Sequence, residues 1–194
     1  LLLLLQCLFQ LYSPFFHIDM KLAFLFSFFL SLLSASSFRV ENSLITYFGV
    51  HYLHKWEGST SDVKGVVSYD KNIDQYECSI SVPLSTFSSG NDNRDSNMLV
   101  YCRAFDFPNI NFQSTSIKVN ESTLEIEGKI EFAGEEKEIK TNAKLNSLDN
   151  NLFTIEGELD ILLSEFKVER PSLLFVEIED LVKIKYLIQG VKNE

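Results

Sequence analysis

In the second half of the chain, apolar and polar residues alternate over several long segments. The alternation is clearest at 124–132, 153–161 and 182–186, where branched or aromatic residues mostly alternate with charged ones. Because successive side chains of a β-strand point to opposite faces, each segment is predicted to be a strand with one apolar and one polar face. Such strands in series favour an antiparallel sheet that closes around its apolar side, so the predicted fold class is all-β.

The first half of the chain adds shorter strands and one helix. Strands are predicted at 43–53, 63–69, 75–84 and 110–119, which brings the total to about eight. The segment 56–61 is predicted to be a loop, and 97–105 a short helix in the region 95–105, with Pro108 beyond its end. The prediction is an antiparallel eight-stranded barrel, a size that side chains can fill or that can hold one small ligand.

The apolar phase of these strands defines the residues that face the barrel interior. The predicted pocket-lining residues are Val67, Tyr69, Ile80, Val82, Ile110, Phe112, Leu124, Ile126, Ile130, Phe132, Phe153, Ile155, Leu159, Ile184 and Tyr186, with Ile139, Ala143 and Val182 also facing inward. Glu131 and Glu156, each one residue away from this phase, are predicted to face water. A packed core and an apolar pocket have the same sequence pattern, so both stay open at this point.

The N-terminal region has the layout of a targeting segment. Met20 is followed by Lys21, an apolar stretch at 22–33 and small residues at 34–37, which is typical of a secretory signal peptide. We therefore predict a signal peptide at 20–37 and a barrel domain at 38–194, and we interpret 1–19 as spurious upstream translation. A membrane anchor that includes residues 1–33 is the alternative, although polar residues interrupt its apolar run.

Charge and composition narrow the choice of partners. The formal net charge is −10, which repels nucleic acid phosphates and anionic membranes, so no nucleic acid partner is expected. An exported chain would be periplasmic or secreted, with no integral membrane span after signal cleavage. The sequence leaves open whether the protein forms a homodimer. It also leaves open whether Cys78 and Cys102 form a disulfide or stay as buried free thiols.

The residues that could carry chemistry do not form a known catalytic pattern. There is no glycine-rich phosphate loop, nucleophile elbow or Cys-x-x-Cys motif, so no enzyme, cofactor or metal is expected. His51 and His54 are predicted to lie on opposite faces, with His51 in the core or rim and His54 in a loop, where they could not share a metal. Trp56 could plug one barrel end or contact a ligand there.

A central segment carries a more specific signature. Its matching positions are Gly90, Asn91, Arg94, Asp95, Met98, Pro108, Ile110, Phe112 and Ser114, and further matches occur at Ser43, Ile45, Tyr47, His51, Gly128, Gly134, Phe166, Arg170 and Pro171. This pattern resembles the YceI-like family of exported lipid-binding domains across the whole predicted domain. Asn97, Phe107 and Lys167 stand where the family commonly has His, Tyr and Gly.

The resemblance implies a lipocalin-like barrel with an elongated internal pocket for a long amphipathic lipid, of the isoprenoid quinone or polyprenyl type. It implies no cofactor other than such a bound lipid. Arg94 and Asp95 are the most specific pair, with two roles left open. In the first, Arg94 holds loop carbonyls and Asp95 caps the following helix; in the second, Arg94 contacts a lipid head group. The alternative function is a structural or stress-associated barrel whose core is filled by its own side chains.

Overall fold

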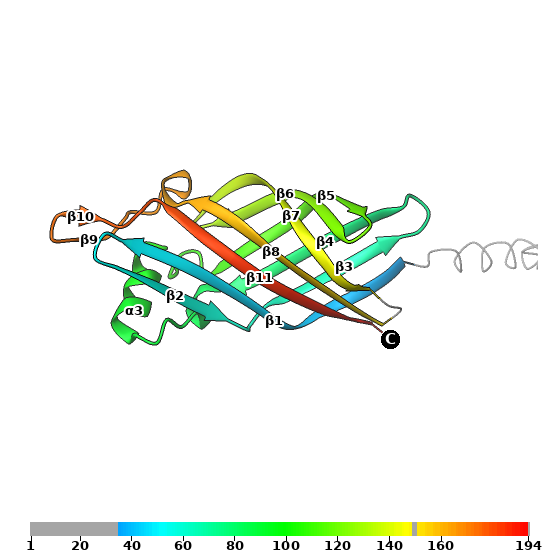
Figure 1. Ribbon diagram of the computed structural model, residues 1–194, viewed down its shortest axis with the longest axis horizontal. Coiled ribbons are helices and arrows are strands. Elements are labelled where there is room, and N and C mark those ends of the chain that lie inside the picture. The colour runs from blue at the N-terminus through cyan, green and yellow to red at the C-terminus, as the bar shows by residue number, and fades with distance from the viewer. Residues whose placement is uncertain (1–34, 149–150, 194) are drawn as a thin grey trace, which may run out of the picture. The chain divides into compact units, whose positions relative to one another are not determined.

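The computed structural model describes residues 35–148 and 151–193, which form an antiparallel β-barrel with one α-helix (Figure 1). The barrel strands are β1 (Ala35–His51), β3 (Lys64–Asp70), β4 (Gln75–Pro83), β5 (Asn109–Asn120), β6 (Thr123–Phe132), β7 (Glu135–Leu148), β8 (Leu152–Leu162) and β11 (Leu181–Lys192). Neighbouring strands pair in this order, and β11 pairs with β1 to close the circuit. The predicted eight-stranded antiparallel barrel is confirmed.

The predicted targeting region is almost entirely outside the described residues. Only its last three positions, 35–37, belong to the structure, and they pair with Ser68–Asp70 as the beginning of β1. Cleavage after Ser37 would therefore remove three paired positions from this strand. Among the described residues, no helix has both the length and the apolar character needed to cross a bilayer.

The loop predicted at 56–61 is wrong, because residues 56–60 belong to a strand. Strand β2 (His54–Thr60) forms a hairpin with the second half of β1, and β3 pairs with the first half along the same edge. Only Trp56 is large and apolar in β2, so the segment lacks the pattern that identifies the other strands. The outer edge of β2 is joined to the loop before the helix by two hydrogen bonds between Ser59 and Ser88.

A β-bulge in β1 changes which residues face the interior. The register with β11 shifts between Glu41 and Leu44, and Asn42 has a left-handed backbone at φ 49°. An extra residue in one strand reverses the alternation of its side chains beyond that point. Phe38 therefore faces inward before the bulge, and Ile45 does so after it.

The helix begins earlier than predicted. Helix α3 spans Asp92–Tyr101, and its N-cap is Asn91, whose side-chain oxygen accepts a hydrogen bond from the Arg94 amide at 3.0 Å. Asp92 and Asp95 lie in the first turn, where negative charge is favourable next to the helix dipole. Asn91 is one of several capping residue types in this loop, so the sequence pattern did not identify which of them begins the helix.

The helix also ends before Phe105, in a hydrogen-bonded C-terminal motif. The amide of Ala104 donates to Leu99 and that of Arg103 donates to Val100, a Schellman arrangement. Arg103 occupies the left-handed position at φ 56°, where glycine is the usual residue. Its guanidinium donates to the Ala133 carbonyl at 3.2 Å and lies 4.7 Å from the centroid of the Phe107 ring. These tertiary contacts support a conformation that the sequence does not indicate.

Several short elements lie between the barrel strands. The 3-10 turns η1 (Leu84–Thr86) and η2 (Leu163–Phe166) precede α3 and follow β8, and a small hairpin of β9 (Ser172–Leu173) and β10 (Val176–Glu177) was not predicted. Phe166 is the most deeply buried large side chain, 1 % exposed, and packs on Phe132 with ring centroids 5.4 Å apart. Lys167 has a left-handed backbone with φ 53°, at a position where the family that the sequence resembles commonly has glycine.

Candidate functional site

The barrel contains a cavity of about 640 Å³. Side chains from all eight barrel strands line it, together with residues of β2, α3 and the segment 168–179. Binding sites for small molecules commonly have volumes of about 300–1,000 Å³ and largely apolar walls. The size and the lining of this cavity therefore fit a binding site for one apolar molecule.

The structure places the predicted lining residues on this wall, with one exception. Val67, Ile80, Val82, Ile110, Phe112, Leu124, Ile126, Ile130, Phe132, Phe153, Ile155, Leu159, Ile184 and Tyr186 all line the cavity, as do Ile139 and Val182. Tyr69 is not among the lining residues: its ring stacks on Tyr76 and its hydroxyl donates to Asp74 at 2.8 Å. Ala143 is buried without lining the cavity.

Inward-facing glycines explain how a barrel rich in aromatic residues stays hollow. At five positions an aromatic ring from a neighbouring strand lies directly over a glycine, so that a Cβ added there would overlap the ring. The pairs are Trp56 over Gly49, Tyr47 over Gly58, Phe112 over Gly128, Tyr186 over Gly157, and Phe153 over Gly190. A ring that rests on a glycine lies along the wall instead of pointing across the interior. These pairs leave volume in the centre of the barrel.

The polar lining residues include a group at the end of the barrel where α3 and β2 meet. His51, His54 and Trp56 form a row of rings, with centroids 5.6 Å and 5.3 Å apart between successive members. The guanidinium carbon of Arg94 lies 5.6 Å from the centroid of the Trp56 ring, a distance suited to a cation–π contact. All four residues line the cavity, and we call this group the mouth cluster.

The prediction that His51 and His54 face opposite sides is wrong. The two residues are cross-strand partners at the end of the β1–β2 hairpin, because His54 begins a second strand instead of a loop. His51 is 3 % exposed and accepts the Leu53 amide hydrogen at Nδ1, at 3.3 Å, so its Nε2 carries the proton that is donated to the Val176 carbonyl at 3.1 Å. Both ring nitrogens of His51 therefore have partners.

Arg94 and Asp95 do not occupy the structural roles predicted for them. Asn91 caps the helix, while Asp95 accepts hydrogen bonds from the Ser89 amide at 3.0 Å and from its hydroxyl at 2.5 Å. Asp95 thus fixes the loop before α3. Within the described residues, the Arg94 guanidinium forms no ion pair and holds no loop carbonyl. It lies against the Trp56 ring on the cavity wall.

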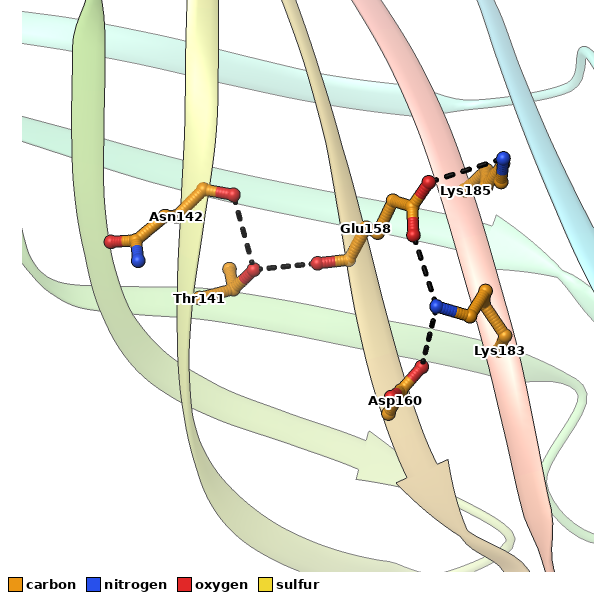
Figure 2. A network of polar contacts seen from close by, with 6 residues as sticks. All are labelled: Thr141, Asn142, Glu158, Asp160, Lys183 and Lys185. Atoms are coloured by element: carbon orange, nitrogen blue, oxygen red, sulfur yellow. Dashed lines mark hydrogen bonds and ion pairs between the residues drawn. The ribbon is translucent and has the colours of Figure 1, made fainter.

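The outer face of the barrel is polar where the cavity wall is apolar. Glu158 on β8 forms ion pairs with Lys183 and Lys185 on β11, each at 3.1 Å, and Lys183 also lies 3.7 Å from Asp160 (Figure 2). These contacts hold the pKa of the Glu158 carboxyl below its usual value, chiefly through the hydrogen bond from Lys183.

Thr141 joins β7 to β8 by a side-chain hydrogen bond. Its side chain lines the cavity, and its hydroxyl donates to the backbone carbonyl of Glu158 at 2.8 Å.

Four titratable groups on the cavity wall keep their protons because they are buried. Burial raises the pKa of the thiols of Cys78 and Cys102 from 9.0 to about 12, and both of these cysteines are free. Burial also raises the pKa of the Tyr47 and Tyr186 phenols above its usual value. The described residues contain no group of three or more His, Cys, Asp or Glu side chains that could hold a metal ion.

Several lining residues were not predicted from the sequence. Tyr47 and Ile45 share one apolar phase of β1, so that strand could have supplied both of them. Phe38 lies in the opposite phase, because the bulge separates it from them. Met98 and Tyr101 lie on a helix whose boundaries were misplaced. The segment 168–179 has no strand or helix periodicity, so no pattern in the sequence brings it to the cavity.

Comparison with known proteins assigns the fold to a family. The model of the YceI-like domain matches residues 34–189, which is most of the chain. The chain belongs to the YceI-like family. A search of curated protein sequences finds no significant match.

Solved structures similar to this YceI-like chain share its fold at low sequence identity. BcnA from Burkholderia cenocepacia is 17 % identical with a TM-score of 0.67, and the match covers 76 % of this chain and 95 % of that one. A polyisoprenoid-binding domain from Saccharophagus degradans, implicated in plant cell wall breakdown, is 13 % identical with a TM-score of 0.67 and coverage of 83 % and 99 %. A YceI protein from Campylobacter jejuni is 16 % identical with a TM-score of 0.61 and coverage of 71 % and 85 %.

Proposed function

We propose that this YceI-like protein is an exported binding protein that holds one long amphipathic lipid, of the isoprenoid quinone or polyprenyl type, inside its barrel. The cavity of about 640 Å³ is the observation that carries the proposal, because apolar side chains from every barrel strand line it. Each buried CH₂ group of such a chain contributes about 0.8 kcal/mol, so a long tail can bind tightly without a polar anchor. The polyisoprenoid-binding domain that shares the fold supports the same class of ligand.

The polar end of the lipid is proposed to lie at the mouth cluster. Arg94 offers a positive charge that no described residue pairs with, and the rings of Trp56 and His54 offer flat surfaces beside it. A guanidinium binds phosphate or carbonyl oxygens through several donors at once. Apolar groups line the rest of the cavity and would hold the tail, so the two parts of an amphipathic lipid find different surroundings.

The alternative is a structural barrel with a self-filled core. The cavity argues against it, because a close-packed interior of protein side chains leaves few voids larger than a water molecule. Export to the periplasm or beyond is part of the proposal and rests on the layout of residues 20–37. The proposal contains no catalytic step.

Trp56 provides a direct binding test, because it is the only tryptophan in the chain and lies at the mouth. Titrating delipidated protein with a long-chain ubiquinone should quench its fluorescence to saturation at one molecule per chain. Arg94→Ala should weaken binding of the quinone but not of a hydrocarbon such as squalene, which has no polar head. Quenching that never saturates, or that is equal for free tryptophan, would contradict the proposal.

A further inference from the structure

Two exposed apolar turns stand side by side at the mouth end of the barrel. Leu174 and Phe175, between β9 and β10, are 73 % and 102 % exposed, and Tyr52 and Leu53, between β1 and β2, are 87 % and 57 % exposed. Figure 1 shows both turns at the same end, with the β3–β4 turn at the other. Four large apolar side chains clustered in water at one end of a barrel call for a physical explanation.

Hydrogen bonds fix the two turns to each other and to the cavity rim. His51 Nε2 donates to the Val176 carbonyl at 3.1 Å, and the Glu179 amide donates to the Val50 carbonyl at 2.9 Å. His51 and Leu173, which flank the turns, also line the cavity. The apolar turns therefore adjoin residues that line the cavity, and one side-chain and one main-chain hydrogen bond hold them there.

The sequence of the β9–β10 turn is unfavourable for folding in water. Leu174 and Phe175 both have left-handed backbones, with φ 53° and 65°. Two successive positive φ values at the centre of a hairpin are the pattern of a type I′ turn, which strongly favours Asn-Gly. Leucine and phenylalanine at these positions cost local conformational energy and expose apolar surface, so neither local stability nor solubility explains their presence.

The charges around the turns indicate the kind of surface they meet. Neither turn contains a charged residue, and Arg170 and Glu177 beside the β9–β10 hairpin form an ion pair with each other. Lys55 and Glu179, one of each sign, both lie next to Val50 at the base of the turns. The two tips themselves are uncharged in a chain whose net charge is −10. Uncharged apolar tips can insert into an uncharged apolar surface, whereas the negative charge of the rest of the chain would be repelled by an anionic surface.

We propose that the Tyr52–Leu53 and Leu174–Phe175 turns insert into the interface of a neutral lipid bilayer and seat the cavity mouth on the membrane. The inference rests on the proposed function, because a bilayer is the apolar surface with which a lipid cavity exchanges its ligand. Projecting tips enter between head groups more readily than they match a flat protein surface, and tyrosine suits the membrane interface.

The test uses two variants of the full-length chain, each with a second indole at one of the two ends of the barrel. In Phe175→Trp, emission in excess of the parent's Trp56 signal should shift to shorter wavelength with phosphatidylcholine vesicles and be lost when the lipid is brominated. Ile73→Trp is the matched control, since Ile73 is 64 % exposed in the β3–β4 turn at the opposite end. Any membrane contact of residues 1–34 would be common to both variants.

A response at position 73 equal to that at position 175, or no response at 175, would overturn the docking proposal. So would a concentration-dependent dimer that Leu174→Asn/Phe175→Gly abolishes, because the turns would then bind a second copy of the chain. This double variant restores the favoured turn sequence and should fold at least as well. The double variant should take up ubiquinone from ethanol as fast as the parent does, but more slowly than the parent from vesicles. If neither the double variant nor the parent takes up ubiquinone from ethanol, the proposed function is rejected instead.

Discussion

Adjacent residues of β8 face opposite sides of the barrel wall. Ile155 lines the cavity, whereas Glu156 is exposed to solvent beside Lys144. Ile155→Lys places an unpaired charge in an apolar space, which should cost several kcal/mol and abolish folding or lipid uptake. Glu156→Lys should change the free energy of unfolding by no more than about 1 kcal/mol, since it alters one surface ion pair. Urea unfolding and extraction of bound lipid from both variants check the register, and a disruptive Glu156→Lys beside a silent Ile155→Lys would reject it.

The glycines beneath the aromatic rings are predicted to maintain the cavity volume. In Gly157→Ala the new methyl group overlaps the Tyr186 hydroxyl and ring, which must move into the interior. We expect a loss of about 1–3 kcal/mol in stability and weaker lipid binding. Adding Tyr186→Leu should restore part of both, because the shorter side chain no longer meets the methyl group. Equal binding by Gly157→Ala and the parent would show that the ring does not control the volume.

The two buried thiols predict a pH dependence at the alkaline side. In the folded chain, the pKa values of Cys78 and Cys102 are raised to about 12, whereas in the unfolded chain these thiols ionise near 9.0. Between these values the folded state binds more protons, so the free energy of unfolding falls as pH rises. The melting temperature should therefore drop from about pH 8 to about pH 10, and less so in Cys78→Ala/Cys102→Ala.

The same burial should make both thiols unreactive in the folded protein. A thiol-specific reagent such as Ellman's reagent attacks the thiolate, which is scarce well below the pKa. The chain has a third cysteine, Cys7, so the test uses a Cys7→Ser background. At about pH 8 the reagent should label neither Cys78 nor Cys102 until denaturant is added. Rapid labelling of this variant in its native state would contradict their burial at 7 % and 8 % exposure.

Among the elements, the long strands of the second half were predictable because each of them has one face in the apolar cavity and one in water. Strand β6 shows this alternation over its whole length, and β8 shows it between its two terminal leucines. Strand β2 was missed because its inward positions include His54 and Gly58, which do not belong to an apolar strand pattern. The glycine is accommodated at an inward position because the Tyr47 ring covers it. The β9–β10 hairpin was missed because its turn has leucine and phenylalanine where a turn sequence was sought.

The N-cap of α3 was not located from the sequence, but a substitution can test it. Asn91→Ala removes the side chain that accepts the Arg94 amide and should cost about 1 kcal/mol of stability. Asn93→Ala, two residues later on an exposed position of α3, should be neutral or slightly stabilising, since alanine is the better helix former. Thermal melts of both variants check this, and equal destabilisation would move the helix start away from Asn91.

For the whole molecule, the sequence predicted the class of barrel and most of its apolar wall, but not whether the barrel was hollow. The inward phase is the same for a packed core and a pocket, and the difference lies in where large rings rest. Phe153 on Gly190 and Tyr186 on Gly157 are cross-strand pairs, and a single sequence does not reveal such pairs before the register is known. The mouth cluster likewise depends on β2, α3 and their contacts.

Native mass spectrometry of the purified protein tests most directly whether the cavity holds a lipid. We expect the chain to carry one noncovalent molecule that organic solvent extracts, that exogenous isoprenoid lipid replaces at the same stoichiometry, and that Ile155→Lys lacks. A chain of bare polypeptide mass that stays bare after incubation with isoprenoid quinones and polyprenols would contradict the lipid-binding account.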